Sequence, residues 1–195
     1  ERSMYFRYHS MSPEWQSVNR IELAQSLGLR EICTGNTSSR CVALTFDVDG
    51  EPTTTAVILD VLRAYNVQCT FFVPGGFADS CPSLVLRLAV EGHEVASHSY
   101  SHPDFASISA ERRYSEITMA DTAISRVTGY SPKPYFRFPY GSRNSAILSQ
   151  LNSLGYLSVY WDIDTSDYTG ISADALYTRV MSQIHPGAIV IMHTF

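Results

Sequence analysis

The sequence predicts an α/β fold, a distorted, incomplete (β/α) barrel with parallel strands. Two observations predict it. From residue 42 onward, short apolar runs alternate with segments of helical periodicity, and the polar residues that stand out each follow one of the apolar runs. Strands that alternate with helices of about 10–15 residues pair in parallel as βαβ units.

The expected strands are compact runs rich in apolar, β-branched and aromatic residues. They cover residues 42–46, 68–73, 93–97, 135–137, 156–161 and 188–192. The expected helices cover residues 54–65, 82–91, 110–128, 143–154 and 173–184, and most of them end at a glycine or at the Pro186-Gly187 pair. Six such strands could form an open doubly wound sheet or an incomplete barrel. No glycine fingerprint follows the first strand, which argues against the dinucleotide-binding form.

The chain divides into two parts of different composition. Residues 1–40 are polar and irregular, with one short helix expected near 19–27, and we expect this lead-in to pack on the outside of the domain. Residues 41–195 carry the alternating pattern. A chain of 195 residues, 45% of them hydrophobic, can bury one sizeable core but is short for two full domains.

The net charge and the hydropathy of the chain argue against some classes of binding partner. The net charge of −5 argues against nucleic acid and against an anionic membrane surface. No run of about 18 apolar residues is present, so no membrane span is predicted. An uncharged polymer or a small ligand fits this composition better, and a monomer is expected.

The four cysteines suggest an oxidising setting. Cys33 and Cys41 bracket a short polar loop that a disulfide could close, although free cysteines fit the spacing equally well. Asn36 lies in that loop within a glycosylation sequon, which suits a secreted or cell-surface protein.

The polar residues decide between the two sheet architectures, because all of them follow expected strands. They are Asp47 and Asp49; His98 and His102; Arg137 and Tyr140; Asp162, Asp164 and Asp167; and His193. In a parallel barrel the loops that follow the strands gather on one face, where sites are built. Five segments that converge on one rim favour the barrel and predict a site there.

A metal site is the first chemistry that these residues suggest. His98 and His102 are four residues apart, which places two imidazoles on one face of a helical turn. Asp49 supplies a third, oxygen ligand. Two histidines and one carboxylate with open positions suit catalytic Zn²⁺, with Co²⁺ as the alternative metal. In the simpler interpretation, the histidines only form hydrogen bonds within a loop.

Five motifs together resemble the carbohydrate esterase family 4 polysaccharide deacetylases, the NodB-homology family, and within it the fungal chitin deacetylases. They are Thr45-Phe-Asp-Val-Asp-Gly50, His98-Ser-Tyr-Ser-His102, Phe136-Arg-Phe-Pro-Tyr-Gly141, Trp161-Asp-Ile-Asp-Thr-Ser-Asp-Tyr168 and Ile189-Val-Ile-Met-His193. The resemblance covers residues 40–195 and implies a deacetylase-type barrel that removes N-acetyl groups from chitin or a related N-acetylated glycan.

The resemblance also implies roles for individual residues. Asp47 would be the general base, and Arg137 would orient it and favour its ionised form. The backbone N–H of Tyr140 would donate to the oxyanion, and His193, supported by Asp167, would protonate the leaving amine. Asp49, His98 and His102 would hold the metal; Tyr168, Ile191 and Trp161 would line the acetyl pocket.

Several of these residues have simpler interpretations. Arg137 could instead pair with Asp164, and Tyr140 and Trp161 could belong to the core. His9, His93 and His185 lie outside every cluster. Asp60, Glu91 and the other scattered charges are expected on solvated helix faces.

The first motif departs from the family's Thr-Phe-Asp-Asp-Gly, because Val48 separates the two aspartates. Adjacent side chains of an extended segment point in opposite directions, so an insertion can turn Asp49 away from the metal unless the loop bulges. Deletion of Val48 would then strengthen metal binding. Tyr168 also stands where the family commonly has tryptophan. The alternatives are therefore a catalytically impaired homologue that binds cell-wall sugar, and a hydrolase of small non-sugar amides.

Overall fold

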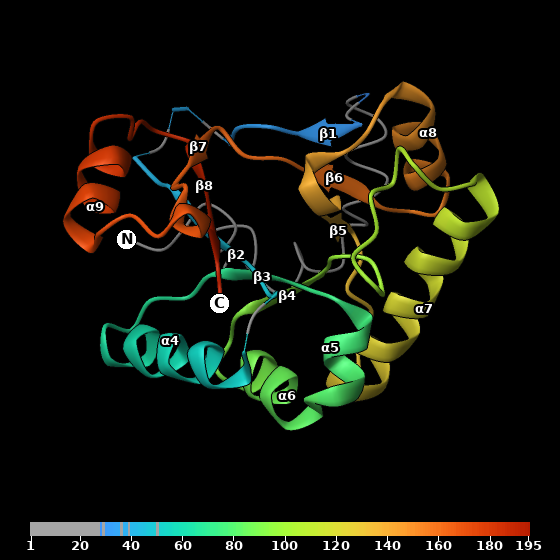
Figure 1. Ribbon diagram of the computed structural model, residues 1–195, viewed down its shortest axis with the longest axis horizontal. Coiled ribbons are helices and arrows are strands. Elements are labelled where there is room, and N and C mark those ends of the chain that lie inside the picture. Colours follow the sequence, from blue (N-terminus) through green and yellow to red (C-terminus); the bar gives the residue numbers. More distant parts are fainter. Residues whose placement is uncertain (1–27, 29, 36, 39, 50) are drawn as a thin grey trace.

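A single parallel sheet of eight strands organises the computed structural model, which describes residues 28, 30–35, 37–38, 40–49 and 51–195. The strand order is β1-β6-β5-β4-β3-β2-β8-β7, and every neighbouring pair is parallel. The sheet curls, and among the described strands β1 and β7 are its two edges (Figure 1). The predicted incomplete barrel is confirmed. The helix expected near 19–27 and the sequon residue Asn36 lie outside the described residues.

Six of the strands correspond to the expected runs, and two were not expected. The strands are β1 (Glu31–Ile32), β2 (Ala43–Asp47), β3 (Thr70–Val73), β4 (Glu94–Ser97), β5 (Tyr135–Phe136), β6 (Leu157–Val159), β7 (Ile163–Asp164) and β8 (Ile189–His193). The additional strands β1 and β7 have two residues each, which is too short to show a period in the sequence. Strand β1 lies in the segment that we expected to be irregular, and it pairs with β6.

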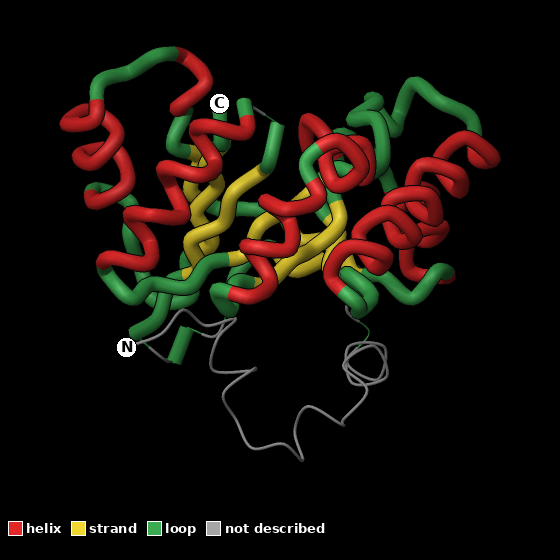
Figure 2. The backbone as a smooth tube through the Cα atoms, turned by 90° about the horizontal axis from the view of Figure 1, so that it is seen from below, coloured by secondary structure: helices red, strands yellow, loops and turns green. Residues whose placement is uncertain are grey.

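The helices cover the outer side of the curled sheet. They are α4 (Pro52–Ala64), α5 (Gly75–Ser80), α6 (Pro82–Val90), α7 (Ala110–Thr128), α8 (Ser145–Ser153) and α9 (Ala173–Met181). Around the curve they follow one another as α9, α4, α6, α5, α7 and α8 (Figure 1), and in Figure 2 the helices lie in front of the strands. The helix α5 begins at the Gly75-Gly76 pair, where we expected only the end of a strand. None of the helices in the described part of the chain is long and apolar enough to cross a membrane.

Alternation along the strands builds two apolar layers. Phe71 and Val73 of β3 pack toward the helices, whereas Phe72 belongs to a second cluster with Ala43 and Ile189. Because successive side chains of a strand point to opposite faces, Thr45 and Asp47 share the face of Ala43. The first motif therefore directs its polar side chains toward the concave side of the sheet.

The four cysteines are free in this structure, so the possible Cys33–Cys41 disulfide is not present. Cys33 follows β1 and Cys41 precedes β2, and these two strands are separated in the sheet by four others. Cys33 and Cys41 therefore adjoin strands from different parts of the sheet. On the way, the Gly35 N–H donates to the Gly187 carbonyl at 2.7 Å.

Candidate active site

The centre of the candidate site is a buried ion pair. Asp47 ends β2 and Arg137 follows β5, and an Arg137 Nη1–H donates to Asp47 Oδ1 at 2.8 Å. Asp47 is 4% exposed and Arg137 is fully buried. Arg137 therefore pairs with Asp47 and not with Asp164, and it holds one carboxylate oxygen of the expected base.

The buried guanidinium has partners on each of its remaining sides. Arg137 donates to the Val159 carbonyl at 3.2 Å and to Thr45 Oγ1 at 2.9 Å, and it lies 4.0 Å from the centre of the Phe72 ring. Thr45 in turn donates to the Val190 carbonyl at 2.7 Å. Because the arginine is fixed by three strands, the orientation of Asp47 is determined by the sheet itself.

His98, which directly follows β4, is a buried neutral imidazole next to this pair. Its Nδ1 lies 2.8 Å from the Arg137 carbonyl, and its Nε2 lies 3.6 Å from Asp47 Oδ2. A carbonyl can only accept, so Nδ1 carries the hydrogen and Nε2 keeps its lone pair. Burial lowers the pKa of His98, although the negative charge of Asp47 opposes that shift. This tautomer is the one that a metal-ligating histidine needs.

His102 adopts a left-handed backbone conformation that turns its ring toward His98. Its φ is 58°, and the two imidazoles meet edge to face with 4.9 Å between ring centres. On its other side, the ring of His102 contacts that of Tyr140 at 4.7 Å. Burial and the neighbouring His98 lower the pKa of His102 to about 4, so both imidazoles are neutral near pH 7.

Val48 directly follows strand β2 and is still hydrogen-bonded to β3. Its N–H donates to the Phe72 carbonyl at 3.0 Å, and its side chain is fully buried in the apolar cluster beneath the helices, beside Phe46. Backbone that stays extended through Val48 would place Asp49 on the face of Asp47, since the two are two residues apart. Whether Asp49 reaches a metal held by His98 and His102 stays a prediction.

Asp49 lies at the edge of the site and is exposed. Partial burial of its carboxyl group raises the pKa of Asp49, and the positive charge of His193 opposes this shift. The negative charge of Asp47 also raises the pKa, whereas His102 lowers it. These interactions place its charge within reach of both halves of the site. Nevertheless, no three His, Cys, Asp or Glu side chains of the described residues are arranged closely enough to hold a metal ion.

The donors present fit a divalent metal in part. His98 and His102 offer neutral imidazoles next to each other, and the Nε2 of His98 points its lone pair toward Asp47 Oδ2. That donor chemistry suits Zn²⁺ or Co²⁺. Asp49 is the remaining carboxylate of the first motif, and its side chain is exposed.

A second carboxylate and imidazole pair lies at the end of β8. His193 Nδ1 and Asp167 Oδ1 are 2.7 Å apart, and the His193 N–H donates to Asp167 Oδ2 at 2.7 Å. Burial alone would lower the pKa of His193, but its hydrogen bond to Asp167 and the charge of Asp47 outweigh the effect of burial and raise the pKa. Of the three aspartates after β6, only Asp167 reaches His193. Asp162 accepts from the Ile189 N–H, and Asp164 accepts from the Ser166 N–H.

The pKa of His193 should depend on Asp167. In Asp167→Asn the charge is lost and burial dominates, so we expect the pKa of His193 to fall and the alkaline limb of any His193-dependent activity to move to lower pH.

The protonated His193–Asp167 pair also stabilises the fold below the pKa of unfolded histidine, and this stabilisation is lost as the pH rises through the folded pKa. The difference in unfolding free energy between wild type and variant should therefore shrink as the pH rises. Titration of His193 by NMR and urea unfolding at several pH values test this, with Asp174→Asn as control; an unchanged pKa of His193 would contradict it.

The expected pocket residues take different positions. Tyr140 is 72% exposed and has a φ of 57°, so it is a turn residue and not core. Tyr168 is also exposed and meets the His193 ring edge to face at 5.7 Å. Ile191 is buried in β8, and Trp161 packs against the inner apolar cluster and stacks on Tyr160 at 4.0 Å. Only the two tyrosines therefore stand at the exposed rim.

Sequence reasoning missed two residues that support the site. Thr45 precedes Asp47 by two positions, so the strand period already placed it on the same face. Glu116 belonged to the charges expected on solvated helix faces, but it is 1% exposed and accepts hydrogen bonds from the backbone of the His98–His102 loop. The polar sequence around Glu116 gives no sign of this burial.

Comparison with known proteins shows the family of this chain. The family model described as polysaccharide deacetylase matches residues 34–159. The chain is similar to a peptidoglycan-N-acetylglucosamine deacetylase of Bacillus cereus, with 36% identity over 78% of this chain and 55% of the relative. It is also similar to a chitooligosaccharide deacetylase of Sinorhizobium fredii, with 32% identity over 85% of this chain and 77% of the relative. These relatives are bacterial, not the fungal chitin deacetylases that we expected.

Solved structures give the same likeness. A peptidoglycan N-acetylglucosamine deacetylase superimposes with a TM-score of 0.83 at 32% identity, covering 88% of this chain and 79% of that chain. A carbohydrate esterase family 4 pseudoenzyme of Bacillus anthracis superimposes with a TM-score of 0.80 at 28% identity, covering 84% and 58%. The chain spans 55% and 62% of the length of two of the curated relatives that it matches.

Proposed function

Since this chain belongs to the polysaccharide deacetylase family, we propose that it is a metal-dependent hydrolase that releases acetate from N-acetylated sugars of a cell-wall polymer. The observation that carries the proposal is the Asp47–Arg137 pair beside two neutral histidines, with the His193–Asp167 pair on a neighbouring strand. A fixed carboxylate base and a histidine of raised pKa are the two proton-transfer groups that amide hydrolysis requires.

The residues divide the reaction between them. When bound at His98, His102 and Asp49, a divalent metal such as Zn²⁺ or Co²⁺ supplies the acidity that makes a water nucleophilic near neutral pH, and it polarises the acetyl carbonyl. Asp47 accepts the proton of the attacking water through Oδ2, because Arg137 occupies Oδ1. The Tyr140 N–H donates to the developing oxyanion. His193 then gives its Nε2 proton to the leaving amine, since its Nδ1 is bound to Asp167.

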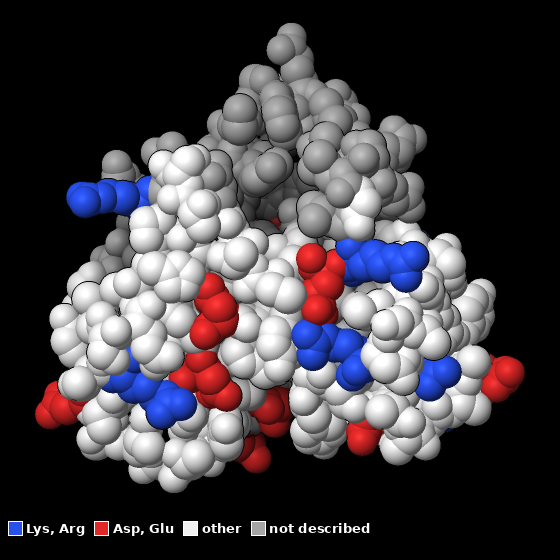
Figure 3. Space-filling view, turned by 90° about the horizontal axis from the view of Figure 1, so that it is seen from above, with Lys and Arg blue, Asp and Glu red and all other residues white. Residues whose placement is uncertain are grey.

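The substrate we propose is N-acetylglucosamine within peptidoglycan or a chitooligosaccharide, with chitin as a further possibility. The names of the relatives support this class, and the exposed rings of Tyr140 and Tyr168 at the rim suit a sugar surface. On the face in Figure 3, basic side chains are dispersed and many adjoin acidic ones, which suits an uncharged polymer. A secreted or cell-surface location and a monomeric state go with this proposal.

A second candidate is a catalytically impaired homologue that binds cell-wall sugar. The observation that favours it is the exposed position of Asp49, which leaves the described residues without a compact three-donor group. The similarity to a structure described as a pseudoenzyme shows that this fold also occurs without activity. The two candidates differ in whether the purified protein binds a metal.

Acetate release from N-acetylated chito-oligosaccharides and from peptidoglycan tests the proposal directly. Assays with added Zn²⁺ or Co²⁺ should release acetate, and a chelator should abolish the release. Binding of the oligosaccharide without acetate release under any of these metals would favour the impaired homologue. Release that persists in the presence of chelator would contradict the metal-dependent mechanism.

A further inference from the structure

The loop that carries both histidines is held by a buried carboxylate from the helix that follows it, α7. Glu116 of α7 accepts hydrogen bonds at Oε2 from the N–H groups of Tyr100 (3.0 Å) and Ser101 (2.7 Å). Its Oε1 accepts from Ser101 Oγ at 2.7 Å and pairs with Arg112 at 2.7 Å. Glu116 is 1% exposed. Burial of a carboxylate is costly unless hydrogen bonds and ion pairs replace its contacts with water, and here these four partners replace them.

Helix α5 holds the same loop from the other side. The N–H groups of Gly75 and Gly76 donate to the carbonyls of Ser99 and Tyr100, at 2.9 and 3.0 Å. A side chain at Gly75 would lie 2.5 Å from the Tyr100 ring and 2.7 Å from the Ala120 Cα, so only glycine lets α5, α7 and the loop approach this closely. The backbone from Ser99 to Ser101 is therefore bound on both edges.

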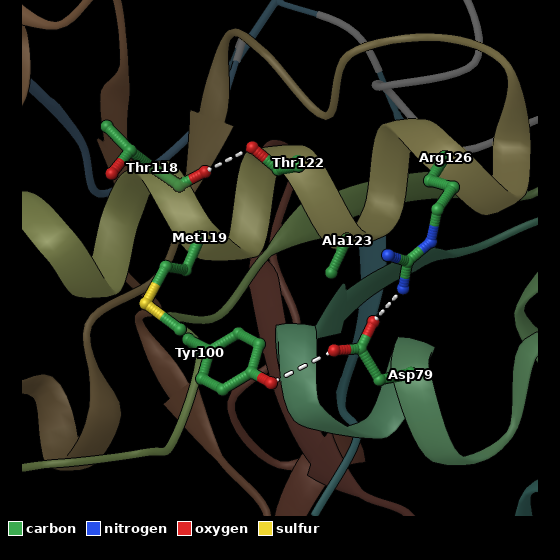
Figure 4. A pocket seen from close by; sticks show the side chains of 7 residues that line it. All are labelled: Asp79, Tyr100, Thr118, Met119, Thr122, Ala123 and Arg126. Carbon is green, nitrogen blue, oxygen red and sulfur yellow. Dashed lines mark hydrogen bonds and ion pairs between the residues drawn. The ribbon is translucent and has the colours of Figure 1, made fainter.

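The side chain of Tyr100 adds a third anchor. It lies in a surface depression between α5 and α7, where its hydroxyl donates to Asp79 Oδ2 at 2.9 Å (Figure 4). Arg126 of α7 pairs with the other oxygen of Asp79, so the tyrosine, α5 and α7 are joined by one network.

The loop needs such support because its backbone is strained at both ends. Ser99 has a φ of 64° and His102 a φ of 58°, in the left-handed region that only a few per cent of non-glycine residues adopt. Residues in this region persist only where the surrounding structure over-determines them. The His102 N–H donates to Ser99 Oγ at 3.1 Å, so a shift at Ser99–Ser101 is transmitted to His102.

We propose that Glu116 is a positioning residue that fixes the Ser99–Ser101 backbone and thereby sets the distance between the imidazoles of His98 and His102. The inference rests on the proposed function insofar as that distance matters for metal binding. Glu116 acts through its reach and its acceptor oxygens, and it does not touch the reacting atoms.

Two substitutions of Glu116 separate the effect of its side-chain length from the effect of its charge. Glu116→Gln keeps the length, since its carbonyl oxygen can accept both N–H groups while its amide donates to Ser101 Oγ. Glu116→Asp keeps the charge but is shorter by one methylene and cannot reach the loop. Glu111 is exposed on the first turn of the same helix, so Glu111→Gln and Glu111→Asp are the matched controls.

The first readout uses the metal-free protein. We expect amide hydrogen exchange at Tyr100 and Ser101 to accelerate at least ~10-fold in Glu116→Asp, with shifted side-chain ¹⁵N resonances of His98 and His102. Glu116→Gln and both controls should stay close to wild type. Thermal melting establishes that each variant is folded at the temperature of measurement.

The second readout is the affinity for Zn²⁺ or Co²⁺ by calorimetry, with the visible spectrum of bound Co²⁺. Glu116→Asp should bind at least ~10-fold more weakly, as is typical when groups that orient metal ligands are changed, whereas Glu116→Gln should remain within about threefold. Equal affinity in both variants and wild type, or a loss in Glu116→Gln alone, would overturn the inference. If the wild type binds no metal, the proposed function fails, and the metal-free readout alone decides the role of Glu116. Unchanged amide hydrogen exchange and unchanged histidine resonances in Glu116→Asp would then overturn that role.

Discussion

Replacement of Asp47 with asparagine should lower the rate of acetate release by about 10²–10⁴-fold, the usual contribution of a general base. The amide has nearly the same shape as the carboxylate and can still accept a hydrogen bond from Arg137, but it cannot accept the proton of the attacking water. Metal affinity should change little, because Asp47 is not one of the proposed ligands. Steady-state acetate release and calorimetric metal binding test the two parts separately.

The same substitution should also affect the fold. Arg137 is fully buried, and its charge would lose its ionic partner in Asp47→Asn. Removal of one partner of a buried ion pair costs about 3–5 kcal/mol of unfolding free energy. Urea unfolding of the variant measures this cost, with the exposed Asp60→Asn as control, and activity must be assayed where the variant remains folded. Full activity in folded Asp47→Asn would show that another group is the base.

Deletion of Val48 is expected to abolish metal binding and to destabilise the protein by several kcal/mol. Val48 is fully buried under the helices, so its deletion would shift Asp49 into an apolar position and place Gly50 where Asp49 stands. An unpaired carboxylate in such a position costs several kcal/mol. This expectation reverses the one drawn from the sequence, in which Val48 was an obstacle to metal binding.

Val48→Ala is the matched control for the deletion. It removes two buried methyl groups at a cost of about 2 kcal/mol but keeps Asp49 on the face of Asp47. We expect Val48→Ala to bind Zn²⁺ like wild type despite a lower urea midpoint. A deletion variant that binds metal more tightly than wild type would show that Val48 holds Asp49 in an unfavourable place.

The strand and helix pattern predicted the fold because each long element has a strong period. The helix expected at 110–128 matches α7, and most of the polar residues after the strands converge, whereas Asp162 and Asp164 bind backbone N–H groups. The two-residue strands β1 and β7 carry no such signal, since their pairing depends on partners distant in sequence. Residue patterning in the sequence predicted existence and type of the long elements but not the edges of the sheet.

The candidate site shows a similar division. The Asp47–Arg137 and His193–Asp167 pairs were predicted and are present. The burial of Val48 could not be predicted, because whether an inserted residue bulges or extends a strand depends on the apolar layer that receives its side chain. The burial of Glu116 could not be predicted, because it depends on how a helix seven residues beyond the loop packs back against it.

The brevity of the two outermost strands also affects how the protein behaves in concentrated solution. An open sheet exposes unpaired N–H and C=O groups along both edges, and such edges recruit strands from other molecules. In the described part of the chain each edge offers only two residues, Glu31–Ile32 on one side and Ile163–Asp164 on the other. Glu31 is further tied to Arg143 by a double ion pair. An incoming strand would find too few hydrogen-bonding groups for stable pairing, so the fold resists edge-to-edge aggregation without closing its barrel.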